Sequence, residues 1–241
     1  AHNIVIVNDG STDEHTADIA KEYADKYPEM ITYVYQQNKG LGAARNTGLN
    51  YVKTPYVAFL DSDDWLCSNY VEEFEKTLRK YNGENIDLFF TLPRVYDNVT
   101  RTCRDWMDKW LFDRIFTAQN AIINPQTDYR IYGLEVNACR RIYSMDFINK
   151  NNFLFPEGVK WEDVYPHYLL LGKAVKCVGI GNIGFYYRVN TSGQITASAG
   201  KGRLDIISVF SDSIRYLTEK HANDELIEYV MKNLLGFTVW S

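Results

Sequence analysis

The stretch IVIVNDGSTDEHTADIAKEYADKYPEMITYVYQ, residues 4–36, predicts a strand, a helix and a second strand. Its first four residues are all apolar, as expected of a strand that is covered on both faces of a sheet. Ser11 and Glu14 stand at capping-box spacing ahead of a helix that ends at Pro28. The second strand, ITYVYQ, follows directly. A strand–helix–strand unit of this kind is typical of α/β proteins.

The alternation continues toward residue 91 and then breaks down. Further strand patterns (YVAFL and IDLFFTL) alternate with two helical patterns, which predicts an α/β fold with a doubly wound, mostly parallel sheet. The later part predicts a mixed half, in which residues 103–116 form an aromatic helix or a substrate-facing loop. Two helices are expected at the C-terminal end, within 203–235. We expect one domain over 1–200, with halves 1–91 and 92–200, and a helical extension over 201–241.

Composition excludes several classes of function. The 241 residues are 46% hydrophobic and carry a net charge of −5 with no basic run, so nothing indicates binding to nucleic acid. The four cysteines lie far apart, which argues against a zinc site and for reduced thiols in a cytoplasmic protein. No apolar stretch approaches the ~20 residues that a membrane span requires.

Three polar clusters follow strands of the predicted sheet: NDGSTD (8–13), NKGLGAARN (38–46) and DSDD (61–64). In a doubly wound sheet, ligands bind beyond the carboxyl ends of the strands, so these clusters are expected to meet. Carboxylates spaced as in DSDD can place two oxygens on one hard cation such as Mg²⁺ or Mn²⁺. The alternative is that they complement the dipole of a helix N-terminus, and the motif alone favours neither.

Two other motifs have more than one interpretation. Gly40 and Gly42 after a strand outline a dinucleotide-binding loop, but Arg45 replaces its third glycine. Glu162 and Asp163, next to an apolar tryptophan, either serve the dipole of a helix or supply a general base whose pKa is raised by that neighbour. His167 shares the face of Asp163, yet an ordinary structural histidine is the simpler interpretation.

Three stretches together resemble a family 2 inverting glycosyltransferase of the GT-A fold. They are the first strand with its DGS turn, NKGLGAARN with YVAFLDSDDWL, and FPEGVKWEDV. The resemblance is close over residues 4–91 and looser over 147–196. It implies that Asp163 is the catalytic base. It also implies a set of donor-binding residues and, within that set, a D-x-D pair that holds Mn²⁺ or Mg²⁺ through Asp63 and Asp61. The donor-binding set is Asp9, Arg45, Asp61, Ser62 and Asp63.

By this resemblance the chain is expected to move a sugar from a nucleotide-sugar, with a UDP-sugar favoured, to a glycan or lipid-linked acceptor in surface polysaccharide synthesis. A cytoplasmic location is expected, with peripheral contact at the inner face of the plasma membrane left open. The family also has a strand and helix ahead of the DGS strand. The printed sequence lacks both, so we expect the chain alone to be unstable.

Three alternatives stay open at this point. An NAD(P)-dependent oxidoreductase would bind its cofactor without a metal. A non-catalytic sugar-nucleotide-binding module would bind UDP with a metal and turn nothing over. A glycosidase would also use paired carboxylates, but it leaves the DGS and ARN turns without a purpose.

Overall fold

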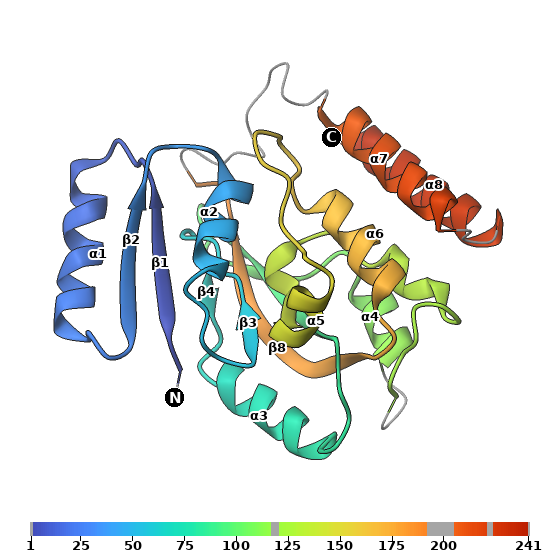
Figure 1. The fold of residues 1–241 in the computed structure, drawn as a ribbon, viewed down its shortest axis with the longest axis horizontal. Helices are drawn as coiled ribbons and strands as arrows, with labels where there is room; N and C mark the ends of the chain where they lie inside the picture. Colours follow the sequence, from blue (N-terminus) through green and yellow to red (C-terminus); the bar gives the residue numbers. More distant parts are fainter. Residues whose placement is uncertain (1, 117–120, 192–204, 221–223, 241) are drawn as a thin grey trace.

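The computed structural model describes residues 2–116, 121–191, 205–220 and 224–240 (Figure 1). The proposed domain boundary at residue 200 lies outside these residues. The helices and strands follow one another as β1 (Ile4–Asp9), α1 (Glu14–Lys26), β2 (Ile31–Gln36), α2 (Leu41–Leu49), β3 (Tyr56–Ala58), β4 (Trp65–Leu66), α3 (Tyr70–Lys80), β5 (Leu88–Asp97), β6 (Cys103–Asp105), α4 (Lys109–Phe116), η1 (Tyr129–Gly133), η2 (Ala138–Arg140), β7 (Arg141–Ser144), α5 (Met145–Lys150), α6 (Val164–Lys173), β8 (Cys177–Val189), α7 (Asp205–Glu219) and α8 (Asp224–Trp240).

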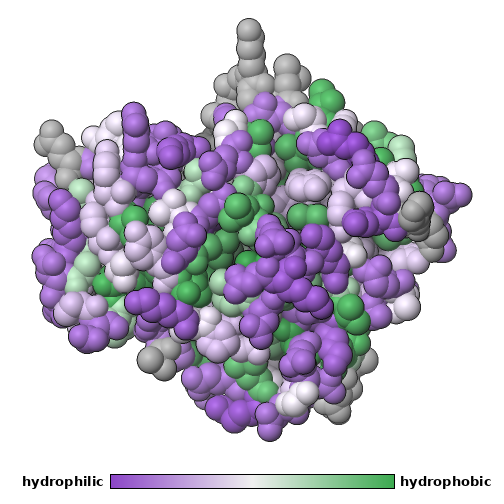
Figure 2. Space-filling view, in the orientation of Figure 1, coloured by the Kyte–Doolittle hydropathy of each residue, from purple (hydrophilic) through white to green (hydrophobic). Residues whose placement is uncertain are grey.

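The N-terminal strand–helix–strand unit forms as the sequence predicts, with β1 and β2 paired in parallel. The capping prediction was wrong in detail. Asp13 caps α1 by accepting from the His15 backbone N–H at 2.8 Å, whereas the Ser11 N–H donates to Asn8 Oδ1 at 2.8 Å. Among the described residues β1 bonds to β2 on one side only. Figure 2 shows apolar surface between this unit and the larger body of the molecule.

The larger sheet has six strands in the order β3-β7-β5-β8-β4, with β6 paired to β5. It is mixed: β5 and β8 run parallel, while β3 and β5 each pair antiparallel with β7. The α/β fold is therefore as expected. Among the described strands, β1 with β2 and β5 with β8 pair in parallel and the other four pairings are antiparallel, so the strands are mixed rather than mostly parallel. After α6 the chain forms one long strand, β8.

Side chains of β5 alternate between two cores, because successive residues of a strand point to opposite faces. Phe89 packs on the face covered by α3, with Phe74 and Leu78 of that helix. Leu88 and Phe90 enter the larger core on the other face, which α4, α6 and the C-terminal helices complete. Within the segment 103–116, Cys103–Asp105 form β6 and Lys109–Phe116 form α4, so the helical alternative holds for the second half of that segment only.

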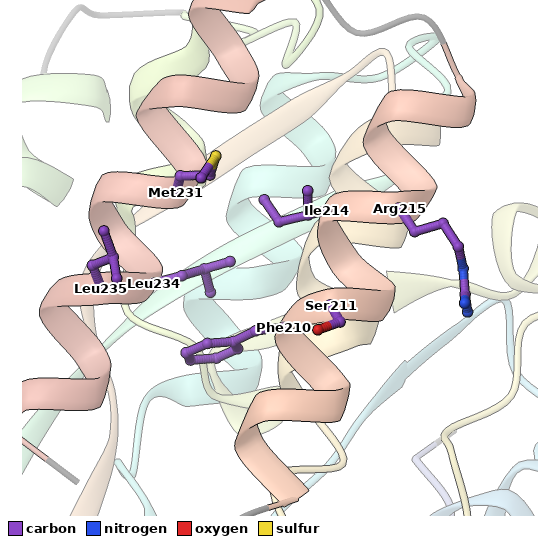
Figure 3. Close-up of a pocket in the computed structure, with 7 residues that line it drawn as sticks. All are labelled: Phe210, Ser211, Ile214, Arg215, Met231, Leu234 and Leu235. Carbon is purple, nitrogen blue, oxygen red and sulfur yellow. The ribbon is translucent and has the colours of Figure 1, made fainter.

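The two C-terminal helices form as expected, and α7 lies against α6 at the edge of the molecule (Figure 1). An apolar groove runs between α7 and α8, in which Phe210, Ile214 and Leu234 point toward one another (Figure 3). Arg215 is the charged side chain at its rim. This groove offers little to a charged ligand. Along the described residues, no helix combines the length and apolarity needed to cross a membrane.

Candidate active site

Asp9 stands at the end of β1 and binds the turn that follows β2. Its Oδ1 accepts from Gln36 Nε2 at 2.6 Å and from the Lys39 backbone N–H at 2.9 Å. Its Oδ2 accepts from the Gly40 N–H at 2.8 Å. The DGS and NKG turns are therefore fixed to each other by one carboxylate. The role of Asp9 in binding the donor stays a prediction.

Arg45 lies on α2 and joins the two acidic motifs. It is only 7% exposed; Nη2 donates to Asp61 Oδ1 at 3.1 Å and Nη1 to Glu162 Oε1 at 2.5 Å. Burial by itself opposes the charge, but several neighbouring acidic groups, Asp61 first among them, more than offset it, so the pKa of Arg45 lies above its usual value. The guanidinium also lies 5.3 Å from the ring centre of Phe155. The DSDD and WED motifs lie far apart in the sequence, and the structure brings both into contact with the guanidinium of Arg45.

The same helix is pinned to the FPEG turn ahead of Glu162. Asn46 Nδ2 donates to the Phe155 carbonyl at 2.9 Å, and Asn46 Oδ1 accepts from the Phe155 N–H at 2.8 Å. A Cβ on Gly42 would lie 2.1 Å from the Pro156 carbonyl oxygen. Gly42 is therefore required for close packing of α2 on this turn. Sequence analysis did not assign Asn46, although its place beside Arg45 in ARN was a signal.

The DSDD turn follows β3 and presents its residues unequally. Asp61 is half-buried and paired with Arg45, whereas Ser62 is exposed. Asp63 is partly exposed and has no hydrogen-bond partner among the described residues. Asp64 points inward, where its Oδ1 accepts from the Arg188 N–H of β8 at 2.8 Å. Burial, before the charges of Asp63 and Asp61, raises the pKa of Asp64 to about 7. Asp64 therefore anchors the turn and leaves Asp63 free.

The carboxylates suit a divalent cation only in part. The described residues contain no group of three or more His, Cys, Asp or Glu side chains placed to hold a metal. Asp63, with Asp61 beside it, could supply one or two ligands. A magnesium-type site commonly takes its remaining ligands from substrate phosphates and water. The donor set therefore fits a metal that binds together with a phosphorylated ligand.

Asp163 is the N-cap residue of α6, yet its side chain makes no capping hydrogen bond. Burial, followed by the neighbouring Glu162 carboxylate, raises the pKa of Asp163 to about 7. Arg45 and Arg141 act in the opposite direction. The carboxyl is still partly exposed, so it can reach a substrate. Desolvation, which the neighbouring tryptophan suggested, is thus the first cause, and a pKa near neutrality suits a general base.

His167 is a structural residue. It is 1% exposed, and its Nδ1 pairs with Arg141 Nη2, which can only donate. Its Nε2 therefore carries the proton and donates to the Tyr132 carbonyl at 3.3 Å. Burial and the charge of Arg141 hold the pKa of His167 well below its usual value. This confirms the simpler interpretation of that histidine.

Comparisons with known sequences agree with this arrangement. The profile of Glycosyl transferase family 2 matches residues 1–138. The uncharacterized glycosyltransferase EpsJ of Bacillus subtilis is 42% identical over 193 residues, 78% of this chain and 52% of EpsJ. The teichoic acid poly(glycerol phosphate) polymerase of Staphylococcus epidermidis is 26% identical over 236 residues, 93% of this chain and 30% of the polymerase. The chain thus spans about half or less of these relatives.

Solved structures show the same fold. S. aureus TarS 1–349 in complex with UDP-GlcNAc matches 98% of this chain and 64% of its own, with a TM-score of 0.71 and 17% identity. The mannosyltransferase PcManGT from Pyrobaculum calidifontis, in complex with GDP-Man and Mn²⁺, matches 97% of this chain and 64% of its own, with a TM-score of 0.61 and 14% identity. At these identities the likeness concerns the fold, a mixed α/β GT-A architecture with a curled sheet.

Proposed function

The chain belongs to glycosyl transferase family 2, and from this premise we propose that it transfers a sugar, with inversion, from a nucleotide-sugar to a hydroxyl acceptor. A UDP-sugar is the proposed donor, because the similar TarS structure is a complex with UDP-GlcNAc. A glycan or lipid-linked acceptor in surface polysaccharide synthesis is the proposed class, in keeping with the teichoic acid polymerase among the relatives. We also propose a cytoplasmic location, with or without contact at the membrane.

One observation carries the proposal: Asp163 has a free, partly exposed carboxyl with a pKa of about 7, beside the cluster of Arg45, Asp61 and Glu162. Asp163 takes the proton of the acceptor hydroxyl as that oxygen bonds to the anomeric carbon. The bond from this carbon to the diphosphate oxygen breaks, and its electron pair leaves with the nucleoside diphosphate. Attack from the face opposite the leaving group inverts the configuration.

The donor half of the site is proposed around Asp9, Arg45, Asp61, Ser62 and Asp63. Asp63 would hold Mn²⁺ or Mg²⁺, with Asp61 beside it. Bound there, the cation would offset the negative charge on the departing diphosphate. Arg45 already pairs with Asp61 and Glu162, and its positive charge offsets one of their two negative charges, which lessens their repulsion of an anionic donor. The similar PcManGT structure is a complex with GDP-Man and Mn²⁺, which supports this choice of metal.

The alternatives fit the geometry less well. Gly42, which suggested a dinucleotide loop, packs against the Pro156 carbonyl, and this packing accounts for the glycine without a pyrophosphate. A purely binding module needs no carboxyl with a pKa near neutrality. Neither alternative therefore uses Asp163.

The proposal is tested by thermal stabilisation with UDP, GDP and NAD, each with and without Mn²⁺, on the wild type and on Asp63→Asn. Stabilisation by UDP that requires both Mn²⁺ and Asp63 is the expected result. Stabilisation by NAD alone, unaffected by metal and by Asp63→Asn, would refute the proposal. Ser68→Ala, a change in an exposed residue outside the DSDD turn, serves as a control variant.

A further inference from the structure

Glu135, in the loop between η1 and η2, is a carboxylate that the site described above does not use. Its side chain is held on one side: Oε2 accepts from Trp106 Nε1 at 3.1 Å. Trp106 is itself fixed, because it is 5% exposed and packs edge-on against Tyr187 with ring centres 5.2 Å apart. Oε1 has no protein partner among the described residues and is not enclosed. One oxygen of Glu135 is thus positioned while the other stays open.

The backbone of Glu135 is fixed as firmly as its side chain. The Glu135 N–H donates to Asp108 Oδ2 at 2.6 Å, and its carbonyl accepts from Arg140 Nη1 at 3.2 Å. Arg140 and Asp108 form a buried ion pair, 1% and 7% exposed, with Arg140 Nε and Nη2 left without partners among the described residues. Buried ion pairs contribute little net stability, and unpaired buried donors cost free energy. This costly arrangement suggests that the position of Glu135 matters for function.

The same loop lies against the first turn of α6, where Asp163 stands. Tyr132 and Asn137, on either side of Glu135, are both tied to His167: the Tyr132 carbonyl accepts from His167 Nε2, and Arg141 links the Asn137 carbonyl to His167 Nδ1. The His167 N–H donates to the Asp163 carbonyl at 3.1 Å. Glu135 is close enough for the charge of Asp163 to contribute to its raised pKa of about 8, which is caused first by desolvation.

We propose that Glu135 binds the acceptor, forming a hydrogen bond through Oε1 to one hydroxyl of a sugar or polyol while another hydroxyl of the same molecule meets Asp163. This inference rests on the proposed function and adds a residue that selects polyhydroxylated acceptors. A carboxyl that is largely protonated near pH 7 donates to a hydroxyl oxygen, so glutamine can replace it there and an apolar residue cannot. Trp106, Asp108 and Arg140 are positioning residues for it.

The test measures binding of methyl β-glucoside, methyl β-galactoside, methyl N-acetyl-β-glucosaminide and glycerol to the chain with UDP and Mn²⁺ bound, by ligand-observed NMR. We expect Glu135→Leu to weaken binding of at least one probe about tenfold or more, the effect of losing a hydrogen bond to a group in a desolvated site. Glu135→Gln is expected to stay within about threefold of the wild type at pH 7. Glu84→Gln, at an exposed ion pair with Lys176, is the matched control.

A second readout is taken on the wild type, so it does not depend on how the Glu135 variants fold. In the wild type, the indole N–H resonance of Trp106, assigned with Trp106→Phe, is expected to shift when the sugar binds. Equal affinity of the Gln and Leu variants, or no shift at Trp106, would overturn the inference. So would failure of every probe to bind a wild-type chain that binds UDP with Mn²⁺. Failure to bind UDP would instead refute the proposed function, so the two are distinguishable.

Discussion

Asp163→Asn tests the proposed base through both the rate and its pH dependence. Asparagine keeps the size of the side chain but cannot accept a proton at neutral pH. Loss of a general base costs about 10²–10⁴-fold in rate, while donor binding should be unchanged because the proposed partner of Asp163 is the acceptor. The size of the loss is one half of the prediction.

The other half follows from the raised pKa of Asp163. With a pKa of about 7, about one tenth of the carboxyl is ionised at pH 6 and about nine tenths at pH 8. The wild-type rate should therefore rise about tenfold between these pH values. A carboxyl with an ordinary pKa would be fully ionised throughout and would give a flat profile. The residual activity of Asp163→Asn should lose the rise.

The assay is release of UDP, with Mn²⁺ present, from a UDP-sugar that the wild type hydrolyses, with UDP-GlcNAc tried first. Water is the acceptor, because the proposed base would act on water as on a sugar hydroxyl. The donor is kept saturating at each pH, so that changes in its binding do not enter the rate. Asp212→Asn, which alters an exposed pair with Arg215, is the control. A wild-type profile that is flat between pH 6 and 8, or an Asp163→Asn variant with an intact rate, would refute the reasoning.

Three further predictions concern stability and are checked by urea unfolding with a chelator present. Arg45→Met leaves the buried Glu162 carboxylate without its partner and should lower the free energy of unfolding by about 3–5 kcal/mol. A change in an exposed ion pair should lower it by at most about 1 kcal/mol, and equal losses would contradict the buried-pair argument. The new Cβ of Gly42→Ala would clash with the Pro156 carbonyl, so this variant should lose about 1–3 kcal/mol of unfolding free energy. The Cβ of Gly48→Ala would lie 3.6 Å from the nearest atom, so that variant should be neutral or stabilising. The reverse order would exclude close packing of Gly42 on the FPEG turn. Because the folded state holds the proton of Asp64 more tightly than the unfolded state, this residue should lower the free energy of unfolding as the pH rises from about 4 to about 7. Asp64→Asn should remove up to about 1.4 kcal/mol per pH unit of that slope, and an unchanged slope would argue against the raised pKa.

The sequence by itself determined the N-terminal order of strands and helices, the two C-terminal helices and the acidic motifs. These features depend on local rules: apolar runs in strands, apolar stripes in helices, and polar residues where strands end. The local rules failed at the start of α1, where they predicted Ser11 as the capping residue. The Ser11 N–H donates to Asn8 Oδ1 instead, and Asp13 caps the helix. The motifs predicted which residues gather at the site, but not what each would contact.

Only the tertiary structure decided those contacts, because they join residues far apart in the chain. Arg45 meets Glu162 across 117 positions, and Asn46 meets Phe155 across 109. No local pattern encodes such pairs, since they arise when α2 packs on the FPEG turn. Glu135 shows the same limit most clearly. A single glutamate in a loop carries no signal in the sequence, and it becomes a candidate only when folding desolvates it, fixes it to Trp106 and brings it beside α6.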